Sequence, residues 1–271
     1  MKTYPLTLFT AITMAVCSMS LSSCGDEDND DSLTEDKTEK ELYFTVKDKV
    51  ITYYYDNRKE ERKDLIPEHL VDDMIGGETL VGGVPVSSQP GLSGYVGVQG
   101  ITKIVLDPSI IDYRPTTLRG FFLIDAKCTA TSIEGLQYLN TSEVKDMSGL
   151  FAWCSNLKHL DLSTFDTKNV EDMSYMFEHC SSLIDVNLNS FNTRKVKNMQ
   201  VMFLCESLER IYVGDGWTTE SVTPSIMFVN CDKLVGEKGT TFKGNQPNNY
   251  TYAHVDGGES YPGYMTYKAK P

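Results

Sequence analysis

The sequence predicts an α/β solenoid whose coils of about 26 residues each contribute a short helix and a parallel strand. Cysteines recur along the second half of the chain at intervals of 26, 26, 25 and 26 residues, and phenylalanines recur at 26, 26 and 25. A fixed period of roughly 20–50 residues is typical of repeats that bury their apolar faces against their neighbours. The recurring residues are Cys128, Cys154, Cys180, Cys205 and Cys231, with Phe151, Phe177, Phe203 and Phe228.

One coil, residues 166–188, shows why both a helix and a strand are predicted. Apolar side chains at offsets 0, 3, 6, 7 and 10 from Val170 form one face of a helix that would reach Cys180. Val186 and Leu188 then alternate with polar neighbours, which indicates a strand. Each coil therefore predicts one short helix followed by one strand, and we expect the strands to stack into a parallel sheet.

A polar pair precedes the first valine of each predicted helix. Side-chain oxygens of Asp, Asn and Thr accept hydrogen bonds from the free N–H groups of a first helical turn. The sequence therefore predicts that these pairs cap the helices. The pairs are Asn140-Thr141, Asp166-Thr167, Asn192-Thr193 and Thr218-Thr219.

The N-terminal residues predict export and lipid anchoring. Residues 1–23 combine a basic start with an apolar stretch shorter than the about 20 residues of a transmembrane helix, which indicates a secretory signal peptide. The run Leu-Ser-Ser-Cys-Gly around Cys24 resembles a bacterial lipobox, which implies cleavage before Cys24 and acylation of its sulfur and amine. Residues 24–41 are acidic, and we expect them to form a disordered tether. Such an acidic run resembles the surface-export signal of Bacteroides-group lipoproteins, which implies a surface-exposed position on the outer membrane.

Three further segments follow the tether. Residues 42–100 are expected to form a β-rich N-terminal cap, because residues 42–46 alternate, residues 50–55 favour a strand, and a short polar loop between them indicates a hairpin. Residues 101–235 hold the repeats. Residues 236–271 are expected to form a C-terminal cap.

Phrases within the repeat resemble a known family. Residues 157–165 read L-x-x-L-x-L-x-x-F, as in a leucine-rich repeat, residues 162–167 read L-S-x-F-D-T, and residues 170–183 read V-x-x-M-S-x-M-F-x-x-C-S-x-L. Together they resemble the BspA-like surface proteins, a leucine-rich-repeat branch of Bacteroides and related bacteria, over residues 101–271. The resemblance implies a leucine-rich-repeat-like solenoid. It also implies a lipid-anchored surface protein that takes part in adhesion or binds a partner. It implies no catalytic residue.

Composition and motifs argue against several other functions. The net charge of −13 argues against nucleic-acid binding, which needs basic patches. No nucleophile motif accompanies the four histidines, so an enzyme is not expected, nor is a cofactor. The repeat cysteines occur once per coil and never as C-x-x-C, which favours buried thiols. Disulfides between adjacent coils and metal ligation are the alternatives.

The polar side of the predicted strands is the candidate binding surface. If Leu160 and Leu162 point inward, their neighbours point outward and form columns along the concave face. Such a face suits an extracellular protein or glycan. The alternatives are a merely solvated face, a structural role in the cell envelope, or an accessory role in nutrient uptake. The columns are His159, Asp185 and Arg210, and Asp161, Asn187 and Tyr212.

Overall fold

The computed structural model describes residues 39–65, 100–123, 128–244 and 249–270. All of them belong to one compact unit, Thr38–Pro271. The predicted signal peptide, the lipidation site Cys24 and most of the predicted tether lie outside the described residues. So do residues 66–99 of the predicted N-terminal cap.

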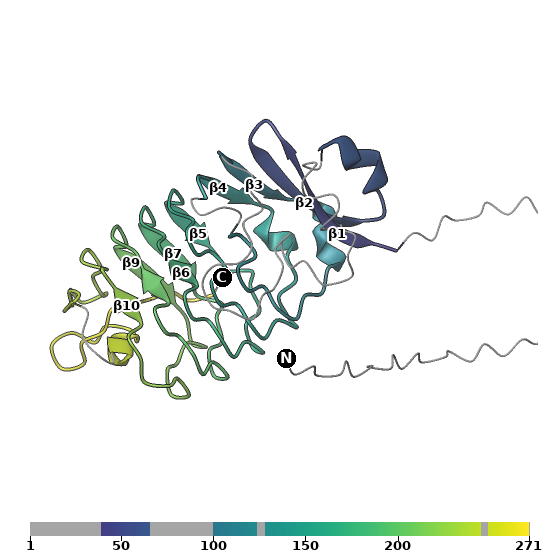
Figure 1. Ribbon diagram of the computed structural model, residues 1–271. Coiled ribbons are helices and arrows are strands. Elements are labelled where there is room, and N and C mark those ends of the chain that lie inside the picture. The colour runs from purple at the N-terminus through teal and green to yellow at the C-terminus, as the bar shows by residue number, and fades with distance from the viewer. Residues whose placement is uncertain (1–38, 66–99, 124–127, 245–248, 271) are drawn as a thin grey trace, which may run out of the picture. The chain divides into compact units, whose positions relative to one another are not determined.

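The described part of the chain is a solenoid of stacked coils, in which strands from successive coils pair in parallel (Figure 1). This confirms the predicted parallel-strand solenoid. One sheet has the order β1-β2-β3-β4 and another the order β11-β9-β7-β5, while short strands form a third sheet, β10-β8-β6. The strands are β1 (Glu41–Lys47), β2 (Val50–Asp56), β3 (Lys103–Leu106), β4 (Ser132–Glu134), β5 (His159–Asp161), β6 (Phe177–Glu178), β7 (Asp185–Leu188), β8 (Phe203–Leu204), β9 (Arg210–Val213), β10 (Phe228–Val229) and β11 (Thr266–Tyr267).

The predicted hairpin is formed by β1 and β2, which pair antiparallel along their full length. Its turn residues Asp48 and Lys49 have φ values of 51° and 64°. Positive φ at both central residues matches the twist that two-residue hairpin turns require. β2 then pairs in parallel with β3, so the hairpin extends the sheet of the first coils.

The helix expected between Val170 and Cys180 is not formed, and this detail of the prediction is wrong. Turns and the two-residue strand β6 occupy the segment. The N–H groups of Met173, Tyr175 and Phe177 donate to carbonyls of the next coil at 2.9 Å each, so they are not available for bonds within a helix. Contacts between coils replace the local bonds that an isolated helix would need. The described helices are short 3₁₀ turns: η1 (Glu60–Leu65), η2 (Pro108–Asp112), η3 (Leu136–Tyr138) and η4 (Asn249–Tyr252).

The threonines of the polar pairs join neighbouring coils instead of capping helices. The Thr167 hydroxyl donates to the carbonyl of Asn192 at 3.1 Å and accepts from the Asn192 N–H at 2.8 Å. Thr141 makes the same two bonds to Asp166. The first member of a pair does cap locally, since the Asp166 carboxylate accepts the N–H of Lys168. The pairs were thus correctly predicted to bind backbone groups, but not helical ones.

A stack of phenylalanine rings runs through the core. The ring centroids of Phe151 and Phe177 lie 5.7 Å apart with 1° between their planes, and Phe177 and Phe203 lie 5.3 Å apart. Phe228 continues the stack at 5.4 Å from Phe203. All four rings are fully buried. Each stacked pair adds about 0.5–1.5 kcal/mol to the burial of the rings, so the stack ties each coil to the next.

The repeat cysteines are buried beside this stack, as the period predicted. Cys154, Cys180, Cys205 and Cys231 are thiols and form no disulfides. The sulfurs of Cys180 and Cys205 lie 3.1 and 3.2 Å from phenylalanine carbonyls of the preceding coil, within reach of a weak S–H donor. Burial raises the pKa of Cys231 to about 12, which keeps this thiol protonated. The cysteines therefore act as small apolar residues.

The residues after the repeats fold back onto the last coils. β11 pairs in parallel with β9. Asp256 joins parts of this segment to each other through hydrogen bonds. The buried Asp256 carboxylate accepts hydrogen bonds from the N–H groups of Lys238, Thr240 and Gly258 and from the Thr240 hydroxyl, at 2.7–3.0 Å. Burial alone would raise the pKa of Asp256, but these bonds outweigh it and hold the pKa well below its usual range.

Candidate functional site on the strand face

The two predicted polar columns are present in the structure. His159 pairs in register with Asp185, which pairs with Arg210. Asp161 pairs with Asn187, which pairs with Tyr212. Strands β5, β7 and β9 carry these residues and lie side by side in Figure 1. The repeat, with intervals of 26 and then 25 residues, therefore placed the six residues in the correct rows.

The columns are linked by polar contacts between neighbouring coils. His159 Nδ1 lies 2.5 Å from Asp185 Oδ2, with the two side chains 64% and 33% exposed. The Asn187 amide donates to Asp161 Oδ1 at 2.9 Å. Burial would raise the pKa of Asp161, but hydrogen bonds from Ser163 and Asn187 outweigh it and lower the pKa. Asp161 is therefore a charged acceptor at neutral pH.

Part of the predicted surface is closed by the C-terminal segment. A guanidinium N–H of Arg210 donates to the carbonyl of Val235 at 2.5 Å, so this side chain holds the fold together. The Lys268 ammonium lies 5.2 Å from the Tyr212 ring centroid, and β11 pairs beside Tyr212. Asn187 is only 7% exposed. Arg210 and Tyr212 are half-buried, as Asp185 is, but their side chains are engaged by later parts of the chain. The accessible part of the columns that these later residues do not engage is His159, Asp161 and Asp185.

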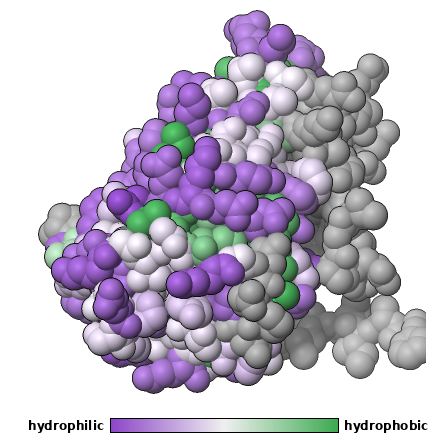
Figure 2. Space-filling view, turned by 90° about the vertical axis from the view of Figure 1, so that its left-hand side faces the viewer, coloured by the Kyte–Doolittle hydropathy of each residue, from purple (hydrophilic) through white to green (hydrophobic). Residues whose placement is uncertain are grey.

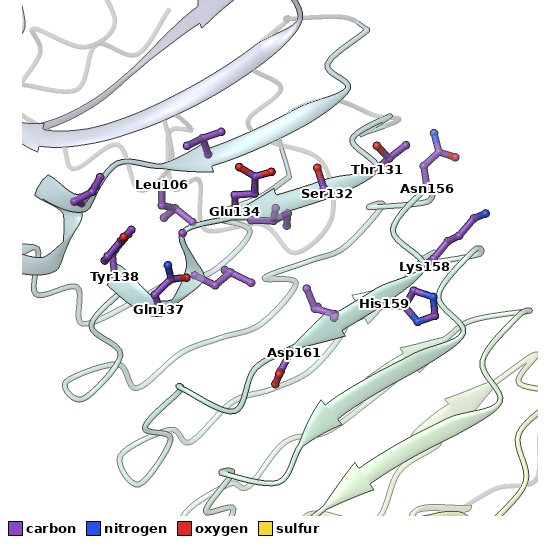
Figure 3. Close-up of a pocket in the computed structure, with 16 residues that line it drawn as sticks. Leu106, Thr131, Ser132, Glu134, Gln137, Tyr138, Asn156, Lys158, His159 and Asp161 are labelled. Atoms are coloured by element: carbon purple, nitrogen blue, oxygen red, sulfur yellow. The ribbon is translucent and has the colours of Figure 1, made fainter. Parts of the chain in front are cut away.

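A cleft adjoins this accessible part and was not predicted. It has a volume of about 990 Å³ and lies between β4 and β5 (Figure 3). Ser132 and Glu134 line one side, and His159 and Asp161 line the other. Its volume is at the upper end of the roughly 300–1,000 Å³ of ligand sites. The cleft therefore extends the strand face into a concave site.

The cleft arises because the coils separate on the strand face alone. β4 pairs with β3 and β5 pairs with β7, but among the described residues β4 and β5 are not paired with each other. On another side of the same coils, Thr117 bridges to Asp146, and the rings of Phe122 and Phe151 stack at 5.1 Å. The two coils are therefore in contact at the ring stack and separate from each other at the strand face.

A glycine shapes the wall of the cleft. Gly135 follows β4 directly and has φ of +82°, a region that other residues rarely adopt. A Cβ at this position would lie 2.2 Å from the carbonyl oxygen of Leu106. Gly135 thus lets the η3 turn approach β3 closely. Gly135 is the residue in the sequence that could have indicated an irregular coil here. The sequence alone does not show the close approach, because it involves Leu106, which is 29 residues away.

The described residues show no large apolar patch on the face that Figure 2 presents. On the face seen in Figure 2, hydrophilic residues predominate and apolar ones appear as small separate patches. Scattered apolar residues are normal on monomeric proteins. In the described ranges, no group of three or more His, Cys, Asp or Glu side chains could hold a metal. No helix in those ranges is long and apolar enough to cross a membrane.

Comparison with known proteins supports the repeat interpretation over part of the chain. Residues 116–240 match the model of a family described as "Mycoplasma protein of unknown function, DUF285". Searches of curated proteins and of solved structures found no match. The matched range contains the coils that carry the ring stack and the polar columns. Over these repeats, the chain is similar to the DUF285 family.

Proposed function

We propose that the chain is a lipid-anchored bacterial surface protein whose repeat array binds an extracellular protein or glycan. The observation that carries this proposal is the accessible polar face at His159, Asp161 and Asp185, which continues into a cleft of about 990 Å³. A large concave site with convergent polar groups is the usual form of a binding site.

The fold suits binding because it holds these side chains on strands. His159 and Asp161 belong to β5 and Asp185 to β7, and buried rings and threonine hydroxyls fix the coils below them. Sites on strands are positioned more precisely than sites on loops. Binding would therefore require little ordering of the site.

The anchoring part of the proposal rests on the sequence. The lipobox resemblance around Cys24, the acidic residues after it and the BspA-like phrases of the repeats support a lipid anchor and exposure at the outer surface. Several acyl chains give stable anchoring where one chain gives only weak attachment. The array would then face extracellular partners.

Protease treatment of intact cells tests the anchoring. Cells that produce the full chain should lose the array to an external protease and should incorporate labelled palmitate into the protein. Cys24→Ala should abolish labelling and release the protein from the membrane fraction. Unlabelled wild-type protein, or protein protected from protease, would contradict the proposed location.

Binding of these cells to immobilised extracellular-matrix proteins and to a glycan array tests the proposed function. We expect Asp185→Lys to weaken binding by about tenfold, or about 1.4 kcal/mol, because it replaces a carboxylate of the face by a cation that would repel basic groups of the partner. Glu171→Lys is the matched control, since Glu171 is an exposed carboxylate paired with Lys197 away from the columns. Equal binding by both variants would remove the strand face as the binding surface. An altered envelope without altered binding would favour the structural alternative.

A further inference from the structure

The cleft presents two open strand edges that face each other. β4 and β5 each pair with one neighbour and border the cleft from opposite sides. The Leu162 N–H donates to the Asn187 carbonyl at 3.0 Å, so alternation turns the backbone groups of His159 and Asp161 away from β7. The Thr131 N–H donates to the carbonyl of Thr102 at 2.9 Å. By the same alternation, the backbone N–H and C=O groups of Ser132 and Glu134 point away from β3. The unused backbone donors and acceptors of both edges therefore point into the cleft.

We infer that this cleft binds an extended peptide segment of a partner protein, which adds a strand between β4 and β5 and completes the sheet. This inference rests on the proposed binding function and names its ligand class. Strand addition obtains affinity from backbone hydrogen bonds and specificity from alternate side chains. Here both edges of the added strand would find partners, whereas strand addition at a single sheet edge uses only one.

The side chains that line the cleft specify which peptide fits. At its centre, the half-buried Ile133 and the buried Leu160 flank the position where an inward side chain of the added strand would lie. One residue further along, Glu134 and Asp161 occupy the neighbouring outward positions of the two edges (Figure 3), where a cationic side chain of the added strand would lie between two carboxylate-bearing residues. An apolar residue next to lysine or arginine satisfies both positions. Each carboxylate already has a partner on its far side, Lys103 for Glu134 at 2.8 Å and Asn187 for Asp161 at 2.9 Å. The exposed pair with Lys103 contributes little, and the second oxygen of Asp161 is free of Asn187, so both carboxylates can still attract a cation.

Fluorescence anisotropy with the labelled peptide Thr-Val-Lys-Val-Thr and the purified full chain tests the inference. This sequence reads the same from either end, so the alternation of apolar and basic residues is the same whether the peptide binds parallel or antiparallel to β4 and β5. We expect saturable binding below about 1 mM. Exchange of the lysine for glutamate should weaken binding by about tenfold or more. Methylation of the lysine amide nitrogen keeps every side chain but removes a backbone donor, and should weaken binding by at least about fivefold.

A protein variant and hydrogen exchange locate the peptide. Glu134→Gln should weaken binding about threefold, whereas Glu171→Gln, which also affects an exposed glutamate paired with a lysine, should not. The peptide should slow amide exchange in both β4 and β5, and leave the Leu162 amide, already bonded to Asn187, unchanged.

Several results would overturn the strand-addition inference. The first is absence of binding at 1 mM peptide, which corresponds to a binding free energy of only about 4 kcal/mol. The others are equal binding of the methylated peptide and protection of one edge alone. A further control is hydrogen exchange without peptide. If the protection of β4 and β5 then rises with protein concentration, a second copy of the chain occupies the cleft, and the inference of a partner peptide is wrong. If Asp185→Lys still weakens cell binding in any of these cases, the proposed function stands and only the ligand class is wrong.

Discussion

Truncation of Phe177 tests whether stacked rings hold the coils together. Its ring is fully buried, and the ring centroids of Phe151 and Phe203 lie 5.7 and 5.3 Å away. Phe177→Ala removes two ring contacts of about 0.5–1.5 kcal/mol each and leaves a cavity. The total cost of such a change is about 3–5 kcal/mol. Since the free energy of unfolding of a domain is about 5–15 kcal/mol, we expect a large decrease in the urea midpoint.

Urea unfolding of the full chain, followed by circular dichroism, measures this cost. Phe177→Leu keeps an apolar side chain but removes both ring contacts, so we expect a loss of about 1–3 kcal/mol. Phe242→Ala is the control, because its ring is only partly buried and contacts Tyr264 at 5.8 Å. If Phe177→Ala costs no more than Phe242→Ala, the ring stack does not join the coils and this reasoning fails.

Three further changes test other contacts. Asp256→Asn should make the free energy of unfolding depend less on pH in acid. Folding lowers the pKa of Asp256, so the stabilisation by its carboxylate is present above about pH 4 and is lost as pH falls through the lowered pKa. Acid titration followed by circular dichroism measures this difference. Thr167→Val removes two hydrogen bonds to the next coil and should cost about 1–3 kcal/mol, whereas Thr164→Val, at an exposed position, should change the urea midpoint little. Gly135→Ala places a Cβ 2.2 Å from the Leu106 carbonyl oxygen and should lower the unfolding free energy by more than about 1 kcal/mol, and unchanged melting would refute the close approach.

The period predicted more of the fold than the pattern inside each coil did. Phe151, Phe177 and Phe203 recur at one interval, and coils that stack with this period bring the three rings into contact and bury them. The pattern from Val170 to Cys180 also fits a helix, because spacing records which side chains are buried and not where the backbone N–H groups donate. The neighbouring coil accepts those bonds, and one coil considered alone does not reveal this.

The candidate site divides in the same way. The sequence by itself determined the rows His159–Asp185–Arg210 and Asp161–Asn187–Tyr212, since a strand alternates every two residues and the coils repeat at a nearly constant interval. Only the tertiary structure decided which of these residues are accessible, because the contacts of Arg210 with Val235 and of Tyr212 with Lys268 join distant parts of the chain. It also decided that the sheet opens between β4 and β5, since that depends on packing around an irregular coil and not on a repeated residue.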